Sequence, residues 1–139
     1  MLERFFEGSD CLLFAYGTAN SGKTYTIQGT QSNPGLLPTL VEEIIEVADR
    51  MSSVSDCELK VTMLEIYQEK IHDLLSEKKE KLSLRDVNGR LEVSRLSSHL
   101  LTSMSGAISL MELAASRRYH CFLYDNIQFQ EHGKYYSFK

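Results

Sequence analysis

Residues 17 to 24, Gly17-Thr18-Ala19-Asn20-Ser21-Gly22-Lys23-Thr24, fill every fixed position of the pattern G-x-x-x-x-G-K-[ST]. Glycines let consecutive backbone N–H groups point toward one place, and a helix that follows adds the positive end of its dipole. A loop of this kind binds phosphate, so the pattern predicts a nucleoside triphosphate as ligand. Lys23 would contact the β- and γ-phosphates, and the Thr24 hydroxyl would hold Mg²⁺.

The residues around this loop fit that prediction. The apolar run from Cys11 to Tyr16 has the composition of a buried parallel strand, and a helix is expected to begin near Gly22. The alternative is a chance match in a loop that happens to contain glycine and serine. The strand and helix context favours the phosphate-binding interpretation over that alternative.

Length and composition predict one soluble domain, since 139 residues with 42% hydrophobic and 24% charged positions suffice for one core. A formal charge of −4, spread along the chain, argues against nucleic-acid and anionic-membrane partners. The first residues are acidic and do not resemble a secretory signal, and no apolar run is long enough to span a bilayer. Cys11, Cys57 and Cys121 show no C-x-x-C spacing, so we expect buried thiols in the reducing cytoplasm.

Residue periodicity predicts helices and strands after the loop. In chain order we expect a short helix that breaks at Gly29, a helix from about Pro38 to Met51, a central strand from Cys57 to Tyr67, two helical turns from Gln68 to Leu75, strands at Lys81–Val87 and Arg90–Leu96, and a helix from about Ser105 to Arg118. The two short strands flank Asn88-Gly89, which is a strong hairpin signal.

The composition changes after Arg118. Residues 119–139 hold four of the seven tyrosines and three of the six phenylalanines, without a steady helical or strand period. We therefore divide the chain into residues 1–118, a partial domain that contains the phosphate loop, and residues 119–139, a divergent aromatic-rich tail.

Three motifs and the order of these elements resemble the kinesin motor domain over residues 1–118. Phe14 to Thr26 is similar to the family's F-A-Y-G-x-T-x-S-G-K-T-Y-T signature, although Thr18-Ala19 replaces the usual Gln-Thr. Asn33 to Pro38 is similar to G-[IL]-[IL]-P, and Leu64 to Leu75 is similar to E-I-Y-N-E-x-[IV]-x-D-L-L. Asn20 before the serine resembles the kinesin-6 group. The resemblance implies an α/β fold: a partial kinesin-type P-loop NTPase whose mixed, mainly β sheet is flanked by helices.

The resemblance also implies functional residues and partners. ATP and Mg²⁺ would be the cofactors, with Thr24 as the metal ligand, and the partner would be the microtubule, placing the protein in the cytoplasm on the cytoskeleton. Tyr25 would either lie near the adenine or pack as an ordinary helix residue. Glu65, Glu69 and Asp73 are expected to be structural. The residues expected to bind the nucleotide are Gly17, Thr18, Ala19, Asn20, Ser21, Gly22, Lys23, Thr24 and Tyr25.

Two family segments do not occur in these 139 residues. N-x-x-S-S-R-S-H, which positions the attacking water, is replaced by Tyr119-His120-Cys121-Phe122-Leu123-Tyr124, and D-L-A-G-S-E is absent. Asp86-Val87-Asn88-Gly89 matches D-x-x-G, but a hairpin turn already explains it. We therefore assign no catalytic residue and expect this chain to have lost hydrolysis.

Other functions remain open. The chain is alternatively a non-catalytic interaction module or regulatory pseudo-motor whose aromatic tail anchors a partner, or a mis-predicted gene fragment of a full motor. A small phosphate-loop kinase is a further alternative, but it requires an acidic Mg²⁺ ligand after an apolar strand, and we find none. A partial sheet is also expected to expose strand edges and apolar surface.

Overall fold

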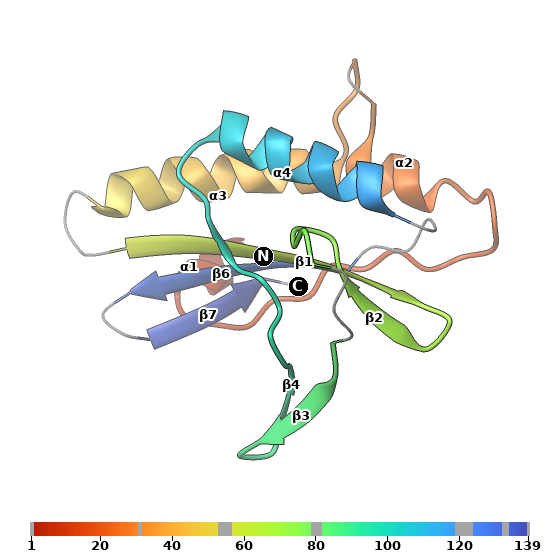
Figure 1. Ribbon diagram of the computed structural model, residues 1–139. Helices are drawn as coiled ribbons and strands as arrows, with labels where there is room; N and C mark the ends of the chain where they lie inside the picture. Colours follow the sequence, from red (N-terminus) through yellow and green to blue (C-terminus); the bar gives the residue numbers. More distant parts are fainter. Residues whose placement is uncertain are drawn as a thin grey trace.

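The computed structural model describes residues 2–30, 32–52, 57–78, 82–118, 124–131 and 134–138. Along the described residues three helices come first, five strands follow, and a fourth helix precedes two further strands (Figure 1). The elements are α1 (Leu2–Phe6), α2 (Lys23–Gln28), α3 (Leu36–Ser52), β1 (Cys57–Tyr67), β2 (Lys70–Asp73), β3 (Leu84–Val87), β4 (Arg90–Val93), β5 (His99–Leu100), α4 (Met104–Arg117), β6 (Tyr124–Glu131) and β7 (Lys134–Phe138).

The main sheet is built around β1, its longest described strand. Its order is β2-β1-β6-β7, with β5 also paired to β1, and each of these pairings is antiparallel. Helices α3 and α4 lie side by side over one face of this sheet (Figure 1). This arrangement confirms the expected α/β class and the central position of the strand from Cys57 to Tyr67.

Helix α3 forms because its apolar residues recur on one face. Val41 and Ile44 are almost fully buried, whereas the acidic residues Glu42, Glu43 and Glu46 are exposed. Helix α4 is capped by Ser103, whose side chain accepts a hydrogen bond from the Gly106 backbone N–H at 3.2 Å. Both helices were expected from the sequence, and both are confirmed.

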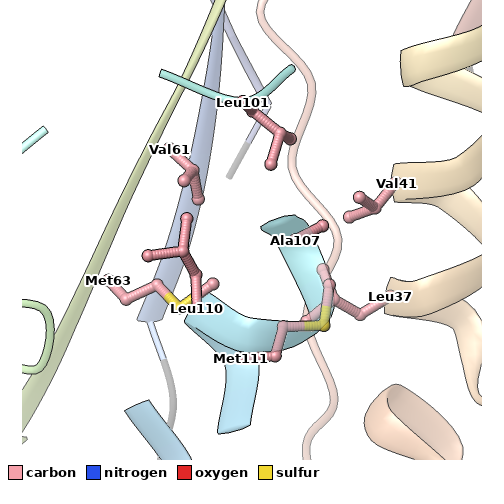
Figure 2. Close-up of a pocket in the computed structure, with 8 residues that line it drawn as sticks. All are labelled: Leu37, Val41, Val61, Met63, Leu101, Ala107, Leu110 and Met111. Carbon is pink, nitrogen blue, oxygen red and sulfur yellow. The ribbon is translucent and has the colours of Figure 1, made fainter. Parts of the chain in front are cut away.

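The core lies between α3, α4 and β1. A small cavity of about 10 Å³ remains there, and Figure 2 shows that only apolar side chains surround it. This volume is about that of one water molecule, and the lining offers no hydrogen-bond partner for one. The cavity is therefore an imperfection in core packing and not a ligand site. Its lining residues are Leu37, Val41, Val61, Met63, Leu101, Ala107, Leu110 and Met111.

The predicted hairpin is confirmed as a separate two-stranded sheet of β3 and β4, which extends away from the main sheet (Figure 1). Asn88 and Gly89 both have positive φ, 56° and 78°, as a two-residue hairpin turn requires. The Gly89 N–H donates to Asp86 Oδ1 at 2.8 Å. The D-x-x-G match is thus explained by turn geometry.

The expected helical turns from Gln68 to Leu75 are wrong. Gln68 and Glu69 form a tight turn with φ of 48° and 60°, and β2 then pairs with β1 from Leu64↔Asp73 to Tyr67↔Lys70. The helical spacing of apolar residues is overridden because β1 offers a hydrogen-bonding edge that a local helix would leave unpaired.

The expected buried strand from Cys11 to Tyr16 is also wrong. Within the described ranges, no strand pairs with residues 12–16, and Leu12, Phe14 and Tyr16 are 58%, 73% and 94% exposed. Cys11, a half-buried thiol, and Leu13 pack against the core. An apolar run becomes a buried strand only when neighbouring strands and a covering layer are present. The exposed apolar surface expected of a partial sheet is therefore confirmed here.

Two strands, β6 and β7, lie within residues 119–139, where the sequence showed no steady helical or strand period. β6 pairs with β1 from Cys57↔Glu131 to Leu64↔Tyr124, and β7 continues the sheet. Residues 124–131 and 134–138 thus belong to the main sheet, although the boundary at residue 118 stays a prediction. Cys121 lies outside the described residues. None of the helices that the structure describes is long and apolar enough to cross a bilayer.

Candidate phosphate-binding site

The candidate site is the exposed loop that leads into α2. Asn20 and Gly22 have left-handed φ values of 60° and 88°, and helix α2 begins at the next residue, as expected. The Ser21 N–H donates to the Thr18 carbonyl at 3.3 Å, and the Thr26 N–H donates to the Gly22 carbonyl at 2.8 Å. No side chain caps the first turn of α2. Its backbone N–H groups therefore form a positively polarised end beside the loop.

The Lys23 side chain folds back over this loop. Its Nζ donates to the Gly17 carbonyl at 2.9 Å and to the Thr18 carbonyl at 2.5 Å. The ammonium group thus lies inside the curve of the loop, where the sequence pattern predicts a phosphate contact. A bound anion would compete with these carbonyl groups for the ammonium.

The two ends of the loop lie close together at Gly17 and Ser21. A Cβ on Gly17 would lie 2.6 Å from Ser21 Oγ, which is too close for two non-bonded atoms. A different Ser21 rotamer would relieve this contact, so the distance shows that Gly17 and Ser21 lie against each other, which brings the two ends of the loop together. This curvature, the uncapped helix start and Lys23 together fit a phosphate group. The structure brings Gly17, Thr18, Ser21 and Lys23 together.

Four expected site residues lie outside this contact set. Ala19 and Asn20 form the exposed turn of the loop, while Gly22 and Thr24 flank Lys23 at the helix start, where Thr24 is exposed. Among the described residues, no group of three or more His, Cys, Asp or Glu side chains could hold a metal ion. A Mg²⁺ ion at this loop would consequently depend on Thr24, phosphate oxygens and water.

Tyr25 is held by Asn33, a residue for which the sequence predicted no role at the site. The Asn33 Nδ2 group donates to the Tyr25 hydroxyl at 2.6 Å, and Tyr25 remains 54% exposed. Asn33 lies in the loop between α2 and α3. In the sequence Asn33 stands only at the start of the motif Asn33 to Pro38, and no sequence signal pointed to its contact with Tyr25.

Helix α2 is anchored at its other end. Ile27 packs against the core, and Gln28 accepts hydrogen bonds from the Arg118 guanidinium at 2.9 and 2.5 Å when its amide oxygen faces the arginine. Because Arg118 directly follows α4, these bonds tie the helix of the phosphate loop to the end of another helix.

Asp73 has the structural role expected of it. Its carboxylate accepts hydrogen bonds from the N–H groups of Leu75 and Ser76 at 2.9 and 3.1 Å, and from the Ser97 N–H and hydroxyl at 2.7 and 2.9 Å. Arg117 donates to the Ser76 carbonyl at 2.8 Å. These bonds join the segment after β2 to the segment before β5 and to α4. Glu65 is fully buried in β1, and Glu69 lies in the exposed turn between β1 and β2.

Comparison with known proteins agrees with the motifs. The kinesin motor domain family matches residues 1–123. The chain is 36% identical over 127 residues to kinesin-like protein KIF14 of Mus musculus, covering 85% of this chain and 8% of that protein. It is 31% identical over 113 residues to kinesin-like protein tea2 of Schizosaccharomyces pombe, covering 81% and 18%. It is 32% identical over 114 residues to kinesin-like protein KIP3 of Saccharomyces cerevisiae, covering 80% and 14%.

The chain spans less than a fifth of the length of these relatives. The likeness of its loop to the kinesin-6 group stays a prediction. The family match covers the phosphate loop, the central strand and α4, so it includes every expected site residue. The chain belongs to the kinesin motor domain family.

Proposed function

We propose that this chain is the ATP-binding part of a kinesin-type microtubule motor, and that it binds Mg²⁺-ATP through the loop from Gly17 to Thr24. The observation that carries the proposal is the position of Lys23, whose ammonium group lies within the curve of a loop that ends at an uncapped helix start. Family membership adds the microtubule as the partner of the whole protein and the cytoskeleton as its location.

Different residues of the chain bind the phosphates, the metal ion and the base in this proposal. The positively polarised start of α2 attracts the phosphate oxygens, and Lys23 exchanges its two carbonyl contacts for charge-assisted contacts to phosphate. Thr24 supplies the protein oxygen for Mg²⁺, an ion that neutralises phosphate charge when it is bound. Tyr25 follows directly and offers its half-exposed ring to the base.

We propose further that these 139 residues do not hydrolyse ATP at motor rates. They contain neither of the two family segments that position the attacking water and sense the γ-phosphate. Phosphoryl transfer depends on such positioning groups, each of which contributes orders of magnitude in rate. The loop is also preceded by an exposed segment instead of a strand, so it is less rigid than a loop fixed at both ends. We expect weak nucleotide affinity.

The test is titration of the purified chain with a fluorescent ATP analogue in Mg²⁺. Lys23→Ala should weaken binding by roughly 10-fold or more, because it removes charge-assisted contacts. Lys78→Ala removes the same charge from an exposed position after β2 and serves as the matched control. Equal affinities of the two variants would refute phosphate binding at the loop. Microtubule-stimulated ATPase activity of the chain would refute the loss of hydrolysis.

A further inference from the structure

The hydrogen bond between Asn33 and Tyr25 links the loop before α3 to the first turn of α2. Tyr25 lies in the first turn of α2, immediately after Thr24, and Asn33 lies eight residues later in the loop before α3. The bond from Asn33 Nδ2 to the Tyr25 hydroxyl is short, at 2.6 Å. The backbone holds only the near end of the Tyr25 side chain. This hydrogen bond restrains the hydroxyl end of the ring as well.

The loop that carries Asn33 is itself fixed. The Asn33 N–H donates to the Thr30 hydroxyl at 3.1 Å and to the Thr30 carbonyl at 3.2 Å, and the Thr30 N–H donates to the Asn33 carbonyl at 2.8 Å. At the base of this loop, Gly29 and Gly35 lie so close that a Cβ on either would overlap backbone atoms of the other. The loop that carries Asn33 is therefore closely packed, so Asn33 is itself held in place where it bonds Tyr25.

We propose that Asn33 is a positioning residue for the nucleoside: it orients the Tyr25 ring so that the ring can stack on the base of a nucleotide whose phosphates occupy the loop from Gly17 to Thr24. This inference rests on the proposed function. Tyr25 is half-exposed, so part of its surface is open to a ligand. Tyr25 directly follows Thr24, the last residue of the phosphate loop, so its backbone adjoins the loop that would hold the phosphates.

The energetic effect follows from preorganisation. A tyrosine ring that is already oriented loses less rotamer freedom when a base stacks on it. Releasing the hydroxyl should therefore weaken nucleotide binding by about threefold, since one rotamer-rich side chain is ordered. Binding of a phosphate-only ligand should be unchanged, because the contact does not involve the loop that holds the phosphates.

The experiment compares Mg²⁺-ATP with Mg²⁺-tripolyphosphate by calorimetric titration of the full 139-residue chain. Asn33→Ala and Tyr25→Phe remove the same hydrogen bond from opposite sides, and Tyr25→Phe keeps the ring. Ser32→Ala is the matched control, because Ser32 lies in the same loop and bonds the Thr30 hydroxyl at 3.3 Å. Unfolding curves of each variant show whether the fold is retained.

We expect both Asn33→Ala and Tyr25→Phe to weaken ATP binding by about threefold, while tripolyphosphate binding and the Ser32→Ala control stay at the wild-type value. The double variant should be no weaker than either single variant, because one bond is lost in all three. Unchanged ATP affinity, or equal losses for ATP and tripolyphosphate, would overturn the positioning role alone. Failure of the wild-type chain to bind either ligand would overturn the proposed function and this inference with it.

Discussion

Substitution of Gly29 by alanine tests whether the loop between α2 and α3 is closely packed. Gly29 has φ 71° and ψ −152°, a backbone conformation that only glycine adopts readily. A Cβ there would also lie 2.2 Å from the Gly35 nitrogen and 2.3 Å from the Asn33 carbonyl oxygen. Since these are backbone atoms, no change of rotamer relieves the overlap.

The expected cost of Gly29→Ala follows from these two terms. The backbone strain costs about 1–3 kcal/mol, and the overlap raises the total to about 3–4 kcal/mol, within the range of severe single substitutions. Gly89→Ala is the matched control, because Gly89 also has positive φ, 78°, but nothing lies within 4 Å of its Cβ position. It should cost only about 1 kcal/mol.

Urea unfolding followed by circular dichroism measures both values. Gly29→Ala should lower the free energy of unfolding by at least about 2 kcal/mol more than Gly89→Ala does. Equal effects of the two substitutions would refute the reasoning, since they would mean that backbone conformation alone matters and that Gly29 and Gly35 do not pack against each other.

Three further predictions concern other parts of the fold. Asp73→Ala should lower the free energy of unfolding in urea by about 2–3 kcal/mol, because it removes the acceptor of four hydrogen bonds. Asp86→Ala in the exposed hairpin should lower it by under about 1 kcal/mol, and equal losses would contradict the role of Asp73 in joining segments. Ile44→Ala, at a fully buried position, should lower the free energy of unfolding by about 2–5 kcal/mol, whereas Ile108→Ala, at a side chain that is 45% exposed, should lower it by under about 1 kcal/mol. A small effect at Ile44 would mean that this position does not belong to the core. Phe14→Ser should reduce self-association in sedimentation velocity without lowering stability by more than about 0.5 kcal/mol, because its ring is 73% exposed; a large loss of stability would show that the ring is packed.

Features that depend on a few neighbouring residues were predictable. Asn88-Gly89 supplies the positive φ values that a tight hairpin turn needs, so β3 and β4 follow from local chemistry. Helix α3 follows from the spacing of its apolar residues, and the start of α2 follows from the glycine before it. The phosphate-binding pattern was predictable for the same reason, since its glycines and lysine are contiguous.

Strand assignments failed where pairing decided the outcome. Residues 68–75 have helical apolar spacing, yet residues 70–73 pair with β1 because a two-residue turn brings them alongside it. Residues 124–131 have no clear period, yet they pair with β1 from Cys57 to Leu64. Residues 12–16 have the composition of a strand but find no strand partner within the described part of the chain.

The sequence by itself determined the family, the phosphate loop, the hairpin turn and the long helices, because each depends on contiguous residues or on a fixed local period. Only the tertiary structure decided which apolar segments joined the sheet and that Asn33 holds Tyr25. The physical reason is that a strand gains its hydrogen bonds, and a side chain its distant partner, from residues far along the chain. Local composition does not specify where those residues will lie.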